Sequence, residues 1–233
     1  MNILFQEKKK EAQNAYSFIF KKDSDLKWNP GEYILLSLEH ENPDDRGVER
    51  VFSISSAPSE GIFMITTRYF DNEASSFKKA LFNLKENDSL DIIKPSNSPT
   101  FFNANDESKE YIFLTIGIGI TPVRSVLKEY DIQNKDLKGV LLYGNRDDEY
   151  IFGNEIEEIV KGMPNFRLKK YHNRRIDKEV LENILKEYPN GIFNISGTSE
   201  FTQEMKDILL NDLGLTADRV RSSSFGNGYS KLS

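Results

Sequence analysis

A pair of glycines follows an apolar run and opens a helical segment, in the order Gly117-Ile-Gly-Ile-Thr-Pro122. Glycines let the backbone approach a ligand closely, and the N–H groups at a helix start attract phosphate. Pro122 suits the first helical turn because its missing N–H would have no partner there. The third glycine of the usual dinucleotide fingerprint is absent. The motif predicts a dinucleotide pyrophosphate site, and a tight strand-to-helix turn without a ligand is the alternative.

A second candidate binding segment is Arg50-Val-Phe-Ser-Ile-Ser-Ser-Ala-Pro58, a strand pattern rich in small hydroxyl residues. A guanidinium binds phosphate through a planar fork of donors, and small hydroxyl residues leave room for a flat ring. Taken alone, the stretch favours a solvated Arg50 and a core Phe52. The other motifs of the chain decide whether the stretch binds a ligand or is an ordinary strand.

The amino-acid composition excludes several classes of partner, metal site and cofactor. The 233 residues carry a net charge of −6, which argues against a nucleic-acid partner. The chain contains no cysteine, so it holds no disulfide, zinc–thiolate site or iron–sulfur cluster of its own, and redox chemistry requires an organic cofactor. His40 and His172 are isolated, so no metal site is expected. No leader peptide and no apolar run of membrane-spanning length is recognised, and the expected location is the cytoplasm.

The first hundred residues alternate between apolar and polar positions in short runs. These runs predict antiparallel strands of a small barrel, at residues 16–20, 33–38, 50–54, 62–67 and 89–94. A helix is expected at 76–84, capping one barrel end. The polar segment 94–110 has the composition of a connection, so we expect one domain at 1–100 and a second at 101–233.

Beyond the connection, strands and helices alternate. Strands are expected at 111–116, 139–143, 166–171 and 191–195, and helices at 122–130, 152–161, 177–188 and 201–213. Gly214 ends the last helix. This alternation predicts a parallel sheet covered on both faces, with ligands bound beyond the carboxyl ends of its strands.

Six short motifs occur in an order that resembles the ferredoxin–NADP reductase superfamily. They are Pro30-Gly31-Glu-Tyr33, Arg50-Val-Phe-Ser53, Gly117 to Pro122, Tyr143-Gly-Asn-Arg146, Ser196-Gly-Thr198 and Phe225-Gly-Asn-Gly-Tyr229. The resemblance covers the chain from about Tyr16 to Tyr229. It implies an antiparallel six-stranded flavin-binding β-barrel followed by a five-stranded parallel nucleotide-binding α/β domain. It also implies hydride transfer from NADPH or NADH to a flavin, with FAD favoured over FMN.

The resemblance assigns the flavin site to the barrel. Arg50 is expected on the flavin phosphate, Phe52 along the ring system and Ser53 near N5. The remaining residues expected around the cofactor in this half of the chain are Val51, Ile65, Thr67, Arg68, Ser75 and Ser76. A plain helix cap is the alternative for Ser75 or Ser76.

In the second half, the resemblance assigns the nucleotide site. Gly117 and Gly119 are expected at the pyrophosphate and Thr121 beside the nicotinamide, which makes Ser53, Thr121 and Ser196 the catalytic candidates. The other expected binding residues are Pro122, Asn145, Arg146, Gly197, Phe225 and Tyr229. Coenzyme preference stays open, because Arg146 would attract a 2′-phosphate and the acidic residues 147–149 would repel it.

Two departures from the family pattern bear on turnover. Ser196 stands where relatives commonly have a cysteine near the nicotinamide, and the stretch Arg221-Ser-Ser-Ser-Phe225 lacks a carboxylate often found before the terminal aromatic residue.

Three functions follow as alternatives. The first is an FAD-dependent reductase that passes electrons to a separate acceptor, which would be a ferredoxin, a flavodoxin or a membrane redox subunit. The second is an NAD(P)H:flavin reductase that releases reduced flavin, and the third is a non-catalytic flavin-binding module. The lysines at 8–10 and 78–79 are either a docking patch for an acidic electron carrier or a solvated surface.

Overall fold

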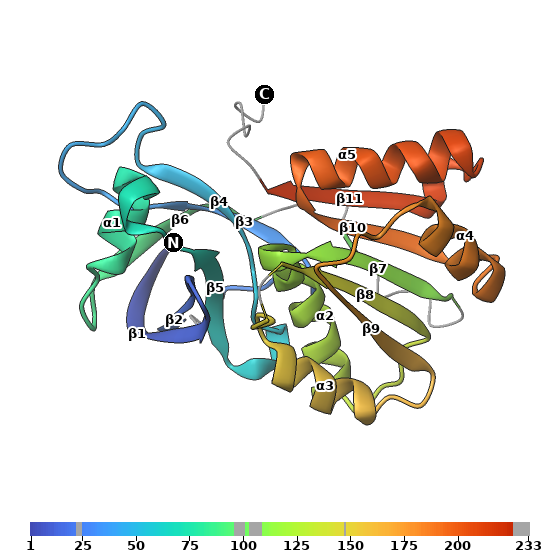
Figure 1. Ribbon diagram of the computed structural model, residues 1–233. Helices are drawn as coiled ribbons and strands as arrows, with labels where there is room; N and C mark the ends of the chain where they lie inside the picture. The colour runs from blue at the N-terminus through green and yellow to red at the C-terminus, as the bar shows by residue number, and fades with distance from the viewer. Residues whose placement is uncertain (22–24, 96–100, 103–108, 147, 226–233) are drawn as a thin grey trace.

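Two sheets of different kinds stand next to each other in the computed structural model, as Figure 1 shows. The structure describes residues 1–21, 25–95, 101–102, 109–146 and 148–225. All strands of the first sheet lie before residue 96 and all strands of the second lie after residue 110. The expected six antiparallel and five parallel strands are confirmed. The domain boundary at residue 100 stays a prediction.

The first sheet curls into a barrel. Its strands are β1 (Asn2–Ala12), β2 (Ala15–Lys21), β3 (Tyr33–Ser37), β4 (Glu49–Ser53), β5 (Ile62–Arg68) and β6 (Ser89–Pro95). They pair in the order β4-β3-β6-β1-β2-β5. A bridge between Ile54 and Ile65 joins the two outer strands, and the interior is filled by apolar side chains such as Phe18, Phe20 and Phe63. Helix α1 (Ser76–Phe82) packs Phe77 and Leu81 into this core.

Strand β1 is present in the structure but was not predicted from the sequence. Its middle is the charged run Glu7 to Glu11, which hides the alternation of apolar and polar residues. Only Ile3, Phe5 and Ala12 are buried, so pairing with β2 along most of its length, rather than burial, defines this strand.

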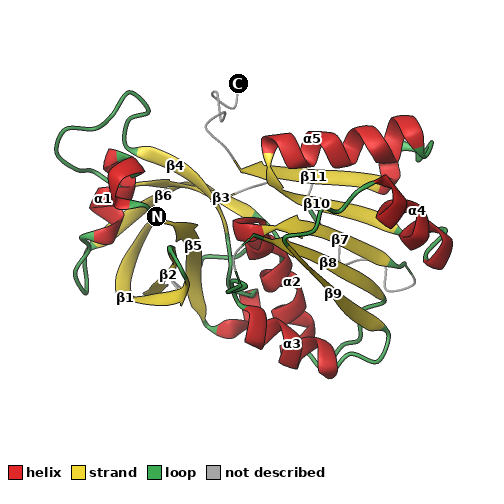
Figure 2. Ribbon diagram, viewed as in Figure 1, coloured by secondary structure: helices red, strands yellow, loops and turns green. Residues whose placement is uncertain are grey.

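The second sheet is parallel, with strands β7 (Tyr111–Ile116), β8 (Gly139–Asn145), β9 (Phe166–His172), β10 (Ile192–Thr198) and β11 (Val220–Phe225). Their order is β11-β10-β7-β8-β9. Strand β11 was not among the strands read from the sequence, because its run of serines lacks an apolar pattern. Figure 2 shows helices on both sides of this sheet, and we call the sheet with its helices the α/β unit.

Strand alternation explains why both faces of this sheet are covered. Tyr111 and Phe113 face α2 (Ile120–Ile132) and α3 (Gly153–Lys161), whereas Ile112 and Leu114 face α4 (Lys178–Glu187) and α5 (Ser199–Asp207). The chain continues from α5 through a wider turn at Ile208–Asp212 to Gly214, whose φ of +68° ends the helix as expected. In the described ranges, no helix has the length and apolar character needed to cross a membrane.

The strand order places the loops after β7 and β10 side by side. After β7 the chain proceeds toward β8, and β10 lies on the other side of β7, so the order reverses at this point. A crevice at such a reversal is the usual ligand position in open α/β sheets. Here the loop after β7 also meets strand β5 of the barrel, so the reversal point lies at the junction of the two units.

Candidate functional site

The glycine loop is a single 3₁₀ turn, Gly117–Gly119, between β7 and α2. Gly117 has a φ of +50°, which favours glycine. Gly119 is close to strand β10, because a Cβ there would lie 2.4 Å from the carbonyl oxygen of Ser196. Packing against β10 is therefore one reason for this glycine, and it is independent of any ligand.

The side chain of Tyr143 is hydrogen-bonded to the glycine loop. Its single O–H is shared between two acceptors, the carbonyl oxygens of Gly117 at 3.2 Å and Ile151 at 3.1 Å. Burial raises the pKa of Tyr143, so the hydroxyl stays protonated and donates these bonds. The side chain thereby ties the loop after β7 to the segment before α3.

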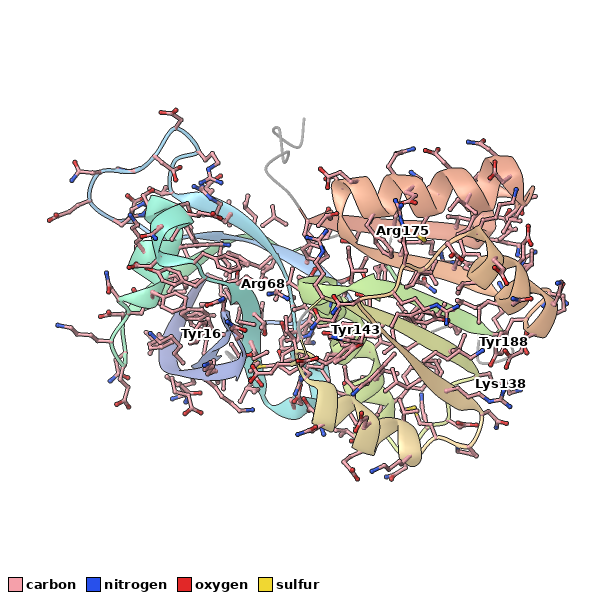
Figure 3. The ribbon with its side chains drawn as sticks, viewed as in Figure 1. Tyr16, Arg68, Lys138, Tyr143, Arg175 and Tyr188 are labelled. Carbon is pink, nitrogen blue, oxygen red and sulfur yellow. The ribbon has the colours of Figure 1, made fainter. Side chains whose placement is uncertain are left out.

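Arg68 reaches from the end of strand β5 to the glycine loop. Its Nη2 lies 3.5 Å from Oδ1 of Asn145 and 3.4 Å from the point a Cβ on Gly117 would occupy. Asn145 is itself fixed by a bond from Nδ2 to the carbonyl oxygen of Glu149, at 2.9 Å. Figure 3 labels Arg68 in the barrel and Tyr143 in the α/β unit on the two sides of this junction. Three residues expected at the cofactors, namely Arg68, Gly117 and Asn145, are thus brought together.

Arg50 lies in a second polar cluster, at the start of β4. Its Nη2 contacts Oδ1 of Asp44 at 2.8 Å, and its Nη1 donates to the carbonyl oxygens of Arg46, Gly47 and Glu49. The second carboxylate oxygen of Asp44 accepts from Nη2 of Arg46 and from the backbone N–H of Ser76, each at 3.1 Å. Donors from three residues therefore converge on one anionic group.

The two serines at the start of α1 make different hydrogen bonds. Ser75 is the N-cap, and its Oγ accepts the backbone N–H of Lys78 at 3.2 Å. Ser76 Oγ accepts the backbone N–H of Asp44 at 2.8 Å and lies 2.9 Å from Nε2 of His40. The cap that was the alternative explanation for these serines is present at Ser75.

Lys78 adds a further cation near this cluster. Its Nζ donates to the carbonyl oxygen of Arg68 at 2.8 Å. Burial, together with the charges of Arg46 and Arg50, lowers the pKa of Lys78. Three cations, Arg46, Arg50 and Lys78, therefore lie close to one another near the start of α1.

The residues of strand β4 are divided between its two faces. Phe52 is buried in the barrel core, with its ring 5.8 Å from that of Phe77, and the Arg50 guanidinium lies 5.4 Å from the same ring. Ser53 pairs with Tyr33 and points to the opposite face together with Val51. The structure thus brings Arg50 and Phe52 together and places Ser53 elsewhere. Their roles around a flavin remain predictions.

The two other barrel candidates lie on β5. Ile65 is fully buried in the barrel core and forms the bridge to Ile54. Thr67 is also buried, and its Oγ1 lies 3.4 Å from the carbonyl oxygen of Arg68.

The catalytic candidates of the α/β unit are buried. Thr121 Oγ1 donates to the carbonyl oxygen of Ile118 at 3.1 Å, within the first turn of the helix. Ser196 is fully buried and pairs in register with Thr115 of β7. Within the described part of the chain, neither the Ser196 hydroxyl nor the Thr115 hydroxyl has a hydrogen-bond partner. Two unpaired hydroxyls therefore lie next to each other near the carboxyl ends of β7 and β10.

The other expected nucleotide residues surround these strand ends. Pro122 is buried in the first turn of α2, and Gly197 is a close-packing position, since a Cβ there would lie 2.7 Å from Cγ1 of Ile116. Arg146 is exposed after β8. Phe225 is half-buried at the end of β11, opposite Thr198, and Tyr229 lies outside the described residues.

Sequence reasoning missed the polar contacts that join the two units. Arg124 of α2 contacts Glu60 of the short turn η1 (Pro58–Glu60), and Glu129 of α2 contacts Ser59. The available signal was Arg124 itself, the charged residue of the mostly apolar run Pro122 to Leu127. A buried arginine requires carboxylate partners, but the sequence does not name them.

Comparisons with known proteins agree with this architecture. The family model of the oxidoreductase NAD-binding domain matches residues 113–207. The flavohemoprotein of Bacillus subtilis is 23% identical over 96% of this chain and 59% of that protein. The glycine betaine monooxygenase reductase subunit of Pseudomonas aeruginosa is 30% identical over 68% of this chain and 43% of that protein. The chain thus spans about half the length of these curated relatives.

Two solved structures share the fold across nearly the whole chain. The ferredoxin–NADP⁺ reductase from Plasmodium falciparum superposes with a TM-score of 0.79 at 18% identity, covering 96% of this chain and 95% of that one. The flavohem-like FAD/NAD binding domain of nitric oxide dioxygenase from Vibrio cholerae gives 0.77 at 22% identity, covering 97% and 98%. With its six-stranded antiparallel barrel and its parallel sheet, the chain shares the fold of these two structures, and its residues 113–207 match the oxidoreductase NAD-binding domain.

Proposed function

We propose that this chain is an FAD-dependent oxidoreductase that accepts hydride from NAD(P)H and passes electrons to a separate acceptor. The observation that carries the proposal is the contact of Arg68 on barrel strand β5 with the Gly117 loop and Asn145 of the α/β unit. This contact joins the expected flavin-binding part to the expected nucleotide-binding part at the point where the strand order of the parallel sheet reverses. The NAD-binding domain match and the reductase relatives support the same assignment.

The flavin side of the proposal rests on an anion-binding cluster. Asp44 already fills that cluster with a carboxylate, and the donors from Arg50, Arg46 and Ser76 that hold it suit a phosphate oxygen equally well. These residues would hold the phosphates of FAD once Asp44 has moved aside. When bound, FAD supplies an acceptor for two electrons.

On the nucleotide side, the chain would position the coenzyme through its backbone. The Gly117–Gly119 turn presents main-chain groups at the start of the 13-residue helix α2. Tyr143 holds that turn, and Arg68 places a positive charge beside it. Ser196 and Thr115 are in register near the adjacent strand ends, and within the described residues neither hydroxyl has a hydrogen-bond partner, so Ser196 would orient a nicotinamide amide group.

The acceptor is proposed to lie outside the 233 residues. The chain has no cysteine, so an iron–sulfur centre of the usual thiolate type belongs to another protein or another part of the polypeptide. Curated relatives named as reductase components of oxygenases support a protein acceptor of this kind.

A second function is favoured by one specific observation. The ion pair between Asp44 and Arg50 occupies the residue expected on the cofactor phosphate. A cofactor that must displace this carboxylate would be held less tightly. The alternative is therefore an NAD(P)H:flavin reductase, in which flavin binds and leaves as a substrate.

Anaerobic stopped-flow absorbance of the purified protein with NADH and with NADPH tests the proposal. Bleaching of a protein-bound flavin by one or both coenzymes is the expected result. Reduction of only added, freely exchanging flavin would favour the second function. A protein that binds no flavin, or whose bound flavin neither coenzyme reduces, would contradict both functions.

A further inference from the structure

The side chain of Arg124 links the barrel to the α/β unit. It is 5% exposed and lies in the first half of α2. Its Nη1 and Nη2 each donate to one carboxylate oxygen of Glu60 at 2.8 Å, and Nη1 also donates to the carbonyl oxygen of Ser55 at 2.8 Å. Both acceptors belong to the segment that follows strand β4, so each of these bonds crosses between the units.

A second carboxylate holds the same guanidinium from within the α/β unit. Glu155 of α3 accepts from Nε at 2.9 Å and from Nη2 at 2.7 Å. The guanidinium also lies over the ring of Phe152, 5.0 Å from its centre. The N–H groups of the guanidinium therefore have acceptors both in the barrel and in α3, which leaves the Arg124 side chain little rotational freedom.

Neighbouring residues of α2 bind the same barrel segment. Ser125 Oγ donates to the carbonyl oxygen of Ser56 at 2.6 Å. Glu129 accepts the backbone N–H of Ser59 at 2.9 Å and its hydroxyl at 2.7 Å. Successive groups from Ser55 to Glu60 are thus attached to one helix, and this helix begins directly after the Gly117–Gly119 turn.

Apolar packing continues across the same boundary. Ala12, Ala15 and Met64 of the barrel belong to one buried cluster with Val123 and Val126 of α2. The small residues at the end of the Arg50–Pro58 stretch therefore have a structural use that the sequence did not indicate. The carbonyl oxygens of Ser55 and Ser56 accept hydrogen bonds from the side chains of Arg124 and Ser125 in α2.

We infer that Arg124 is a positioning residue for the hydride transfer, and that its bonds to Glu60 and Ser55 set the distance between strand β4 and the glycine loop. The inference rests on the proposed function, because it assigns the flavin to the barrel side and the nicotinamide to the loop side. Hydride transfer requires the reacting atoms to be held within a few tenths of an ångström, and misplacement by about 1 Å can cost about 100-fold in rate. A helix fixed to both partners of the reaction meets this requirement.

Glu60→Gln and Glu155→Gln provide a matched test. Each removes one negative charge from the same arginine, and each leaves that arginine paired with one remaining carboxylate. Only Glu60 belongs to the barrel. The limiting rate of flavin reduction at saturating coenzyme should fall about tenfold or more in Glu60→Gln, and should stay within about twofold of wild type in Glu155→Gln. The coenzyme Kd from the same titration should be unchanged in both, and Arg124→Lys should give an intermediate rate because it keeps the charge and loses the fork.

Calorimetric unfolding of the same proteins gives a readout that does not depend on activity. Wild type and Glu155→Gln should unfold in one transition, and Glu60→Gln should separate into two as the barrel and the α/β unit uncouple. If wild type is not reduced by either coenzyme, the proposed function fails while the calorimetry still tests the link between the units. Equal effects of the two glutamine variants on rate and unfolding would overturn the role of Arg124.

Discussion

The Asp44 carboxylate binds the Arg50 guanidinium at 2.8 Å, at the residue where the family resemblance expects a cofactor phosphate. The loop that carries Asp44 is therefore part of the candidate flavin site. Arg50 also donates to the backbone carbonyls of Arg46 and Gly47 in the same loop and of Glu49 in β4, so one side chain holds the loop and the strand together. Flavin affinity should depend on how readily this ion pair opens.

Asp44→Asn should raise the affinity for FAD by about three- to tenfold, because the charge that competes with phosphate is removed. Titration of the apoprotein with FAD, followed by flavin fluorescence, measures the change. Riboflavin has no phosphate, so its affinity should not change. Asp45→Asn is the matched control, since Asp45 is exposed on the same loop. An unchanged FAD affinity in Asp44→Asn would show that the phosphate binds elsewhere.

Arg50→Ala should weaken FAD binding by about 10- to 100-fold, the range expected for losing hydrogen bonds to a charged group. Arg46→Ala serves as the comparison, because the Arg46 side chain is 49% exposed and should contribute less. The same fluorescence titration applies. If the two variants bind FAD equally well, Arg50 has no special part in phosphate recognition.

The ion pair also predicts a pH dependence of stability. Burial disfavours ionisation of Asp44, but hydrogen bonds from Arg46 and Ser76 outweigh it, and the net effect lowers the pKa of this carboxyl. The folded pKa lies below the unfolded value, so the stabilisation is fully present above about pH 4 and is lost as the pH falls further. The difference in urea-unfolding free energy between wild type and Asp44→Asn should be constant from pH 7 to pH 5 and smaller at pH 3. A difference that disappears by pH 6 would rule out this explanation.

Three glycine variants separate backbone conformation from close packing. A Cβ at Gly119 would lie 2.4 Å from the Ser196 carbonyl oxygen, whereas at Gly117 the nearest atom would be the Arg68 guanidinium at 3.4 Å. Gly61 also has a positive φ, of +75°, but no atom lies within 4 Å of its Cβ position. Gly117→Ala and Gly61→Ala should each cost about 1–2 kcal/mol for the positive φ. Gly119→Ala should cost more, up to about 3 kcal/mol, because backbone atoms cannot move aside easily. Urea unfolding measures all three, and equal costs for Gly119 and Gly61 would contradict the packing argument.

Sequence patterns were sufficient to predict most of the strands and helices, because the burial of each residue appears in the pattern of its own segment. In β3, Ile34 and Leu36 are buried in the core and Tyr33 and Leu35 are partly exposed, whereas the apolar strands β7 and β8 are buried on both faces, so each pattern reports its own environment. Strand β1 was missed because its charged residues are exposed and its identity comes from pairing with β2.

The candidate site was less predictable because it depends on contacts between distant residues. Arg50 is recognisable in the sequence, but Asp44, six residues earlier, has no motif that marks it as its partner. Glu60 and Arg124 are separated by 64 residues and are brought together only when the two units dock. The division of Phe52 and Ser53 between opposite faces follows from strand geometry, which the motif comparison did not take into account.

Two fully buried serines should respond differently to loss of the hydroxyl group. Ser56 Oγ accepts the backbone N–H of Met64 at 3.0 Å, so Ser56→Ala leaves a buried donor unpaired and should cost about 1–3 kcal/mol. In the part of the chain that the structure describes, Ser196 Oγ has no such partner, so Ser196→Ala should change the free energy of unfolding by less than about 0.5 kcal/mol or increase it. Urea unfolding without flavin or coenzyme measures both. Because Ser196→Ala is expected to fold normally, a lower limiting rate of flavin reduction in this variant would then report on the orientation of the nicotinamide. A destabilisation as large as that of Ser56→Ala would mean that the Ser196 hydroxyl is bonded in the folded protein and is not available to a ligand.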